Sequence, residues 1–390
     1  MIEKNRIEDR LQKDGIDGII ATSAENVFYM SGFKGPLDPQ RFCMWSMDSS
    51  GPYMILPNGD TDLLITNELK FQEVYSYGNY YYYRGENLSD REEKIMEINF
   101  KNNSSNGIEA LVEAITDVIG KNKKIALETK NLTMTDLEKI SKKSKCDILP
   151  AEKIFSSLRK IKTREEIKRL RKSVEITENA IEYSVGLSEI GMTERDLEKI
   201  YKKKLIDLGG EPGFCLIGFG PHSAESCIPG EIKLKEKDII LYDAGCSYEG
   251  YASDIARTFL FGDGDSDAEE KYKILKNGMD KAISLVHDGA DTADVFGKTM
   301  EYIRSEGSKK GINNLAEFRR HHLGHGIGIS TYDDPLITPI KNRIAANMVM
   351  CIEPPYYEIG NMGIQVEDEI LVTYDGTERL SNAPDEMTCI

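Results

Sequence analysis

Residues 239–261 read IILYDAGCSYEGYASDIARTFLF, and this stretch decides the fold of the second half of the chain. Two runs of β-forming residues flank a turn-prone segment, residues 247–250, which predicts a β-hairpin. With Tyr248 and Glu249 at its tip, Asp243 lies directly opposite Asp254. Opposed side chains on one face have Cβ atoms about 4.5–5.5 Å apart, and like charges there are destabilising. A cation between the two carboxylates would neutralise them.

Residues 349–373, VMCIEPPYYEIGNMGIQVEDEILVT, repeat this pattern. A turn centred near Gly360 places Glu353 opposite Glu367, which gives a second facing pair of carboxylates. Pro354 and Pro355 interrupt the ladder directly after Glu353, so this register is less strongly specified than the first.

A histidine flanked by glycines lies between the two hairpins, in residues 321–328, HHLGHGIG. Glycine lets the backbone approach a ligand closely, although a lone histidine in such a setting is more often structural. In company with four carboxylates, His325 favours a different interpretation. Four carboxylates and one imidazole on β-like segments of one domain suit two divalent cations a few ångströms apart.

The rest of the chain predicts two domains, since 390 residues exceed what one compact core usually organises. Residues 1–157 alternate helical and strand patterns as an α/β domain does. Residues 151–183 read as one long, charge-rich helix that connects the domains. Residues 158–390 group strands and helices, which is typical of an α+β domain.

Composition excludes several classes of function. The net charge of −16 repels nucleic acid and anionic lipid, and no apolar run approaches the roughly 20 residues of a membrane-spanning helix. We therefore expect no nucleic-acid and no membrane partner. Seven widely spaced cysteines without a CxxC pair favour a reducing, cytoplasmic location.

These motifs resemble the pita-bread metallopeptidases, which include prolidase, Xaa-Pro aminopeptidase, methionine aminopeptidase and the non-metal relative creatinase. The resemblance covers nearly the whole chain. It is carried by DAGCSYEGYASDIARTF (243–259), HHLGHGIG (321–328), MCIEPPYY (350–357) and GIQVEDEILVT (363–373), with DGIDGIIATSAENVFYMSGF (14–33) and LRKIKTREEIKRLR (158–171) in the N-terminal half. It implies a creatinase-like N-terminal domain and a C-terminal pita-bread catalytic domain.

The resemblance also implies a site and a reaction. The metal ligands would be Asp243, Asp254, His325, Glu353 and Glu367. Two divalent ions, drawn from manganese, cobalt, iron or zinc with manganese or cobalt favoured, would activate a bridging hydroxide that attacks the scissile amide, while Glu353 shuttles a proton. Family members commonly form homodimers, so we expect one here, with the tyrosine-rich tract at residues 75–83 as a possible border of a partner's cleft.

The outer residues of the site depart from the family pattern. Tyr332 stands where a substrate-binding histidine is usual, and Cys227 replaces a second histidine, with His222 five residues earlier where many relatives have Asn. Gln365 replaces an arginine of the proline-specific enzymes. We expect Tyr332 to take part in catalysis, and His222, Cys227 and Gln365 to contact the substrate. His321 matches a family histidine and is expected to contact substrate or oxyanion, whereas the neighbouring His322 is expected to be structural.

Three hypotheses follow. The first is a hydrolase of Xaa-Pro bonds in dipeptides or at peptide N-termini. The second keeps the fold and metals with a small non-peptide amide or another amino-acid derivative as substrate, which the altered outer residues would permit. The third is a peptide-binding protein with vestigial metals.

Overall fold

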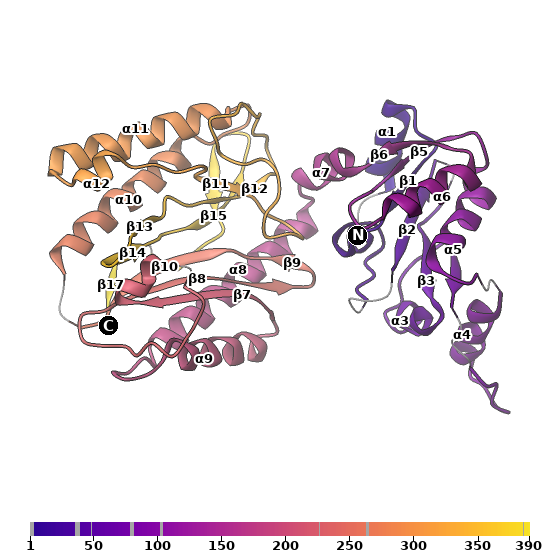
Figure 1. Ribbon diagram of the computed structural model, residues 1–390, viewed down its shortest axis with the longest axis horizontal. Coiled ribbons are helices and arrows are strands. Elements are labelled where there is room, and N and C mark those ends of the chain that lie inside the picture. The colour runs from indigo at the N-terminus through magenta and orange to yellow at the C-terminus, as the bar shows by residue number, and fades with distance from the viewer. Residues whose placement is uncertain are drawn as a thin grey trace. The chain divides into compact units, whose positions relative to one another are not determined.

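The computed structural model describes residues 4–35, 40–47, 49–78, 82–101, 104–225, 227–262, 265–384 and 386–390. The chain divides into two compact units, Met1–Leu158 and Arg159–Ile390 (Figure 1). The first unit is α/β and the second mixes helices with mainly antiparallel sheets, so the predicted fold class is confirmed.

The first unit is built on one mixed sheet with the strand order β4-β3-β2-β1-β5-β6. Parallel pairing joins β3 to β4, β1 to β5 and β5 to β6, whereas β1, β2 and β3 pair antiparallel. The strands are β1 (Gly18–Ala21), β2 (Phe42–Ser46), β3 (Tyr53–Pro57), β4 (Glu73–Tyr77), β5 (Lys124–Leu127) and β6 (Asp147–Pro150). The helices are α1 (Lys4–Asp14), α2 (Ala24–Ser31), α3 (Thr61–Thr66), α4 (Asp90–Lys101), α5 (Gly107–Ala114), α6 (Met134–Ser144) and α7 (Glu152–Lys160).

The tyrosine-rich tract begins in this sheet. Tyr75 and Tyr77 are buried in β4. Residues 79–81 of the tract lie outside the described residues, and its expected contact with a partner stays a prediction.

The single long helix predicted over residues 151–183 is two helices, α7 and α8 (Arg164–Val185). Thr163 ends the connection between them as the N-cap of α8, where its side chain accepts from the Glu166 amide and the Glu166 carboxylate accepts from the Thr163 amide. This capping box satisfies two backbone donors and starts a new helix. Thr193 caps α9 (Glu194–Asp207) in the same way, with Asp196 in the place of Glu166.

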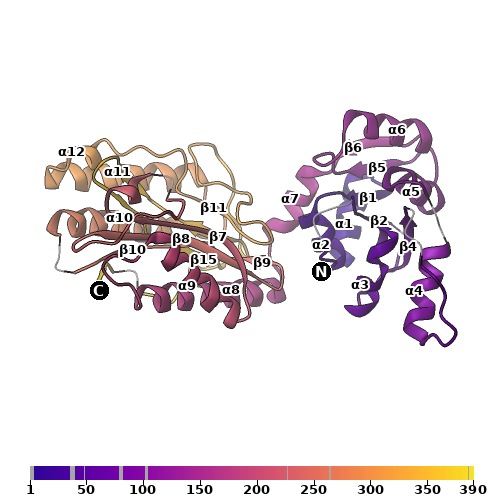
Figure 2. The same cartoon turned by 60° about the horizontal axis from the view of Figure 1, so that its bottom comes forward.

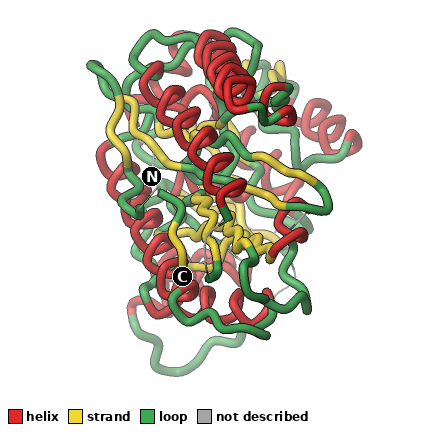
Figure 3. The backbone as a smooth tube through the Cα atoms, turned by 90° about the vertical axis from the view of Figure 1, so that its left-hand side faces the viewer, coloured by secondary structure: helices red, strands yellow, loops and turns green. Residues whose placement is uncertain are grey.

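The second unit places its strands between helices (Figures 1, 2 and 3). Helices α8 and α9 pack against β8 and β7, whereas α10 packs against β12 and β14 and is paired with α11. The remaining helices are α10 (Ser266–Leu285), α11 (Thr292–Lys310) and α12 (Asn313–Ala316). The apolar faces of α10 and α11 share one buried cluster with β12, β14 and β15, including Met279, Ile303, Met350, Ile364 and Ile370.

The strands of this unit form three sheets. The first has the order β17-β10-β8-β7 with β9 paired to β8, the second has the order β11-β12-β15-β16, and the third is the β13-β14 hairpin. Their bounds are β7 (Glu211–Phe219), β8 (Ile239–Tyr248), β9 (Tyr251–Ala252), β10 (Ile255–Leu260), β11 (Gly324–Gly326), β12 (Val349–Ile352), β13 (Tyr356–Glu358), β14 (Met362–Ile364), β15 (Asp368–Val372), β16 (Thr377–Arg379) and β17 (Thr388–Cys389).

Backbone pairing joins the first and second of these sheets beside the candidate site. Ala256 of β10 forms an isolated antiparallel bridge with Glu367, whose amide donates to the Ala256 carbonyl at 3.0 Å. The Thr258 hydroxyl donates to the Gln365 carbonyl at 2.8 Å and accepts from the Gln365 amide at 2.9 Å. These bonds hold the segment that carries Glu367 against the hairpin that carries the two aspartates.

Candidate metal centre

The first hairpin has a different register from the predicted one. Tyr248 pairs with Tyr251 and Asp243 pairs with Ala256, so the tip is Glu249–Gly250 rather than Tyr248–Glu249. Both tip residues have positive φ, 47° and 83°, which Gly250 adopts freely and which suits a tight two-residue turn. Asp243 and Asp254 are therefore not directly opposed.

The two aspartates still meet, because the chain breaks its ladder between β9 and β10. The Ser253 carbonyl comes so close to Gly245 that a Cβ atom there would lie 1.9 Å from it. Only glycine permits this approach. Asp254 turns towards Asp243, and the two carboxyl groups are in hydrogen-bonding contact.

The second predicted register is confirmed. Tyr356 pairs with Ile364, and Ile352 pairs with Asp368, so the ladders on both sides of Glu353 and Glu367 agree with a turn near Gly360. Pro354 and Pro355 separate β12 from β13, as expected of residues that lack an amide donor.

His325 lies in the middle of β11, which pairs with β12. Gly324, before it, has φ 145° and its Cβ would lie 2.0 Å from the Cys351 carbonyl, while a Cβ on Gly326 would lie 2.4 Å from the Asp334 carbonyl. These glycines thus make room for neighbouring backbone rather than for a ligand, which corrects the sequence-based explanation.

The five predicted ligands come together around the His325 ring. His325 Nε2 lies 3.6 Å from Asp254 Oδ2, 3.6 Å from Glu353 Oε1 and 4.0 Å from Glu367 Oε1. Asp243 joins the group through its contact with Asp254. The side chains of this carboxylate cluster, defined as Asp243, Asp254, His325, Glu353 and Glu367, are buried or half-buried.

Burial and mutual repulsion disfavour the charged forms of these carboxyl groups. Burial raises the pKa of Asp243 to about 6 and the pKa of Glu353 to about 8, with the Asp243 charge adding to the rise at Glu353. Burial, followed by the neighbouring carboxylates, raises the pKa values of Asp254 and Glu367 well above the ordinary range. Burial also lowers the pKa of His325 to about 4, so its ring is neutral at pH 7.

The cluster fits a cation by its unsatisfied atoms. Among the described residues, Asp254 Oδ1, His325 Nε2 and Glu367 Oε1 are buried and have no hydrogen-bond partner. His325 Nδ1 is 3.0 Å from the Gly326 carbonyl, which can only accept, so Nδ1 carries the proton and Nε2 presents its lone pair to the carboxylates. Buried polar atoms are rarely left unpaired, and metal ions satisfy this donor set.

Tyr332 connects Glu353 to His322 through hydrogen bonds. The Gly324 amide donates to His322 Nδ1 at 3.3 Å, so the neutral His322 ring carries its proton on Nε2, 3.1 Å from the Tyr332 hydroxyl. The Tyr332 hydroxyl in turn donates to Glu353 Oε1 at 3.4 Å. The Tyr332 ring stacks on His325 with centroids 3.8 Å apart and remains 54% exposed. Tyr332 therefore links the cluster to solvent.

The remaining predicted residues have different surroundings. Gln365 Nε2 donates to Asp243 Oδ2 at 3.1 Å and to Glu367 Oε2 at 3.4 Å, while its Oε1 accepts from the Tyr357 hydroxyl at 2.8 Å. Gln365 thus positions two members of the cluster. His321 is exposed, and its ring contacts that of His322, at 4.2 Å between centroids.

His222 and Cys227 belong to the loop after β7. His222 Nδ1 is 2.6 Å from Glu194 Oε1, and the fully buried Glu194 also accepts from two backbone amides. The Cys227 thiol contacts the Ser223 carbonyl at 3.2 Å, and burial raises its pKa to about 12. The substrate-binding roles expected of His321, His222, Cys227 and Gln365 stay predictions.

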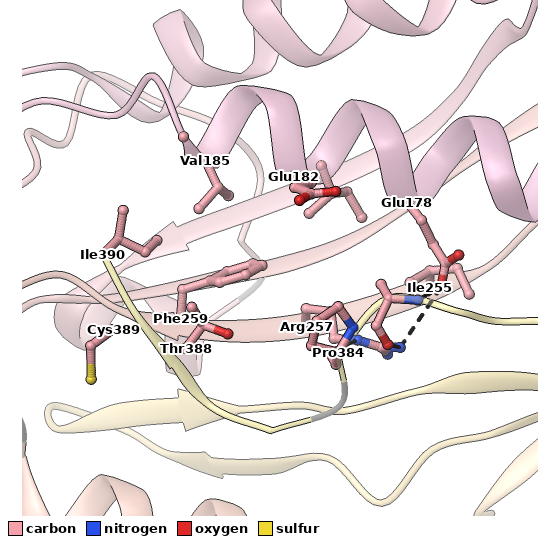
Figure 4. Close-up of a pocket in the computed structure, with 13 residues that line it drawn as sticks. Glu178, Glu182, Val185, Ile255, Arg257, Phe259, Pro384, Thr388, Cys389 and Ile390 are labelled. Carbon is pink, nitrogen blue, oxygen red and sulfur yellow. Dashed lines mark hydrogen bonds and ion pairs between the residues drawn. The ribbon is translucent and has the colours of Figure 1, made fainter.

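Buried Arg257 supports the cluster from β10. Its Nη1 donates to the Glu367 carbonyl at 2.6 Å, its Nη2 to Asp368 Oδ1 at 2.7 Å, and its Nε to the Pro384 carbonyl at 3.1 Å. A pocket of about 240 Å³ lies beside this guanidinium, between α8, β10 and the C-terminal segment (Figure 4). The described members of the carboxylate cluster do not line it.

Three further residues lie near the cluster that the sequence analysis does not place in the site. His322, which is expected to be structural, has its Nδ1 atom 3.4 Å from Glu353 Oε1. Glu369 is buried and accepts from the Asp254 amide at 2.8 Å. Cys351 has its sulfur within 4.8 Å of candidate ligand atoms of Asp254, His325 and Glu367. Strand alternation was a signal for both of the latter, since each lies two residues from a predicted glutamate ligand.

Fold and sequence together define the class of protein. Residues 168–374 match the model of metallopeptidase family M24, and residues 4–161 match the creatinase/prolidase N-terminal domain. The chain belongs to metallopeptidase family M24, and the predicted resemblance to the pita-bread enzymes is confirmed.

Relatives of known sequence include an uncharacterised peptidase of Staphylococcus aureus strain bovine RF122 / ET3-1, 32% identical over 232 residues. The match covers 58% of this chain and 64% of the relative. An uncharacterised peptidase of Staphylococcus saprophyticus is 32% identical over 234 residues, 59% of this chain and 65% of the relative. The chain thus matches somewhat under two thirds of the length of these curated relatives.

Solved structures share the fold over the whole chain. The X-Pro aminopeptidase from Thermotoga maritima has a TM-score of 0.82 with 22% identity and full coverage of both chains. The prolidase from Pyrococcus horikoshii has a TM-score of 0.79 with 22% identity, covering 98% of this chain and 99% of the other. Among the described residues, no helix combines the length and apolar character needed to cross a membrane.

Proposed function

We propose that this chain is a metal-dependent hydrolase that cleaves the bond before proline in Xaa-Pro dipeptides or at peptide N-termini. The observation that carries the proposal is the convergence of buried, unpartnered Asp254, His325 and Glu367 atoms in one cluster. Two divalent cations would be held by Asp243, Asp254, His325, Glu353 and Glu367. Membership of family M24 and the fold shared with an X-Pro aminopeptidase support the same reaction.

When bound, the cations would make a water nucleophilic at neutral pH and polarise the scissile carbonyl. The protein groups then have separate tasks. Glu353 takes up the proton of the attacking water and delivers it to the leaving nitrogen. It is the carboxylate of the cluster that accepts a hydrogen bond from the Tyr332 hydroxyl. Gln365 fixes the orientations of Asp243 and Glu367. His325, neutral and with Nδ1 protonated, presents only Nε2 to the cluster.

Hydrolysis assays with a substrate panel test this proposal directly. Chelator-stripped protein reloaded with manganese, cobalt or zinc is given Xaa-Pro dipeptides, a longer Xaa-Pro peptide and proline-free peptides. We expect metal-dependent release of proline or of the N-terminal residue from Xaa-Pro substrates alone. Two bound metals with no turnover of any peptide would contradict the proposal and favour a non-peptide amide. Tight peptide binding without turnover would favour a binding protein.

A homodimer and a cytoplasmic location stay predictions.

The hydrogen-bond chain from His322 through Tyr332 to Glu353 gives a second prediction. Tyr332→Phe keeps the ring that stacks on His325 and removes only the hydroxyl. We expect kcat to fall about tenfold to a hundredfold, because Glu353 loses the hydrogen-bond donor that orients its carboxylate for proton transfer. Metal content and melting temperature should remain at the parent's values. Tyr374→Phe, at an exposed tyrosine in the same unit, is the control. An unchanged kcat in Tyr332→Phe would exclude a role for this hydroxyl.

A further inference from the structure

The thiol of Cys351 belongs to the same face of the sheet as the carboxylate cluster. Cys351 pairs with His325 across β11 and β12, and with Glu369 across β12 and β15. Antiparallel partners project to the same side of a sheet, and so do residues two apart along one strand. The strand register therefore directs the Cys351 side chain towards the space that His325 and Glu353 share.

Distances and burial agree with this placement. The Cys351 sulfur, His325 and one carboxylate oxygen each from Asp254 and Glu367 all offer ligand atoms within 4.8 Å of one another. Cys351 has no exposed surface. Independently of the thiol, Asp254 Oδ1, His325 Nε2 and Glu367 Oε1 lack hydrogen-bond partners within the described part of the chain. The thiol itself forms a side-chain hydrogen bond with Glu367, and it lies beside the unpartnered Asp254 Oδ1 and His325 Nε2 atoms, so the sulfur is already in contact with the candidate ligands.

We propose that Cys351 is itself a metal ligand, so that one cation of this chain is bound by Asp254, His325, Glu367 and a thiolate. The inference rests on the metal centre of the proposed function and adds sulfur to it. Bonds of about 2.0–2.3 Å place tetrahedral ligands about 3.3–3.8 Å apart. Because the ligand atoms already lie within 4.8 Å of one another, a contraction of at most about 1.0–1.5 Å closes the site.

Sulfur coordination has two chemical consequences. The thiol proton leaves when the metal–sulfur bond forms, so each cation bound through Cys351 releases one proton to solvent. Thiolate is a soft ligand that favours zinc, cobalt and iron(II), whereas an all-oxygen and imidazole site also suits manganese. This chain would accordingly prefer zinc, cobalt or iron to manganese at this position, so that of the two metals favoured by the family resemblance cobalt stays and manganese does not.

Cobalt(II) is the probe, because its absorption spectrum distinguishes a cobalt–sulfur bond from cobalt that is bound by oxygen and nitrogen atoms alone. The metal-free full chain is titrated with cobalt(II) under reducing conditions while absorption is recorded. We expect weak visible bands from bound cobalt and a stronger near-ultraviolet sulfur-to-cobalt charge-transfer band. In Cys351→Ser the visible bands should remain and the charge-transfer band should disappear. The zinc-over-manganese preference, measured by competition, should fall about 10- to 100-fold.

Cys246→Ser provides the matched control. Cys246 is buried on β8, three residues after Asp243 and so on the opposite face of the strand, where its sulfur contacts the Ser173 carbonyl. This variant should keep both sets of bands. Visible bands without charge transfer in the parent, or charge transfer that survives in Cys351→Ser, would overturn sulfur ligation while leaving the metal centre in place. No cobalt binding by the parent would overturn the metal centre itself. The parent spectrum decides even where a variant fails to fold.

Discussion

Asp254→Asn and Glu367→Gln should each abolish hydrolysis while leaving the protein folded. Both residues contribute an unpartnered, buried oxygen to the cluster, so an amide in their place removes a negative charge that a cation requires. Metal ions supply several kcal/mol of transition-state stabilisation, which corresponds to a loss of about 10³-fold in kcat/KM. Kinetics, metal analysis of the dialysed protein and thermal unfolding measure the three effects separately.

The same substitutions should not destabilise the metal-free protein. Each replaces one of several mutually repelling carboxyl groups by a neutral group of similar shape, which relieves repulsion in a buried site. We expect the melting temperature of the metal-free variants to equal or exceed that of the metal-free parent. Asp207→Asn and Glu189→Gln, at exposed positions of the same unit, are the controls. Full activity in Asp254→Asn would refute the assignment of this aspartate.

Removal of metal should eliminate activity and make stability strongly dependent on pH. In the metal-free protein, burial raises the pKa of Asp243 to about 6 and the pKa of Glu353 to about 8, against ordinary values of 3.8 and 4.5. Between the ordinary and the raised values, the folded state binds more protons than the unfolded chain. The stability of the folded state therefore falls as the pH rises. The contribution of these two carboxyl groups is fully present below about pH 4 and is lost above about pH 8.

Thermal unfolding at pH values between about 5 and 8 checks this behaviour. Each kcal/mol lost should lower the melting temperature by about 2–4 °C in a unit of this size. Protein reloaded with metal should lack the decline, because bound cations favour the charged carboxylates. A metal-free melting temperature that rises over this interval would contradict the buried, repelling cluster.

Strand periodicity predicted most of the cluster because it depends on local spacing. The predicted Glu353–Glu367 register is correct, since the strand pairs on both sides of these residues agree with a turn near Gly360. The Asp243–Asp254 register was displaced by two residues, because the tip is Glu249–Gly250 instead of Tyr248–Glu249, and the pairs on both sides of Ser253 keep that one register. The turn-prone segment 247–250 does not by itself specify which two residues form the tip.

Groups from distant segments were harder to predict. His322 precedes β11 and Tyr332 follows it, and only the folded chain brings both beside Glu353. The sequence resemblance favoured His321, which is exposed. Cys351 was overlooked because its chemistry depends on neighbours from β11 and from the hairpin of the two aspartates, which come together only in three dimensions.

The backbone bridge between Ala256 and Glu367 has a consequence for how the protein folds. It spans more than a hundred residues, so the Asp243–Asp254 hairpin can form early from local contacts, whereas the closed cluster requires a long loop to be ordered first. A cation that binds both the aspartate hairpin and the segment carrying Glu367 is held by all of its ligands only in the native state, so only there does it gain its full binding energy. Added metal should thus act after the rate-limiting closure, slowing unfolding more than it speeds refolding.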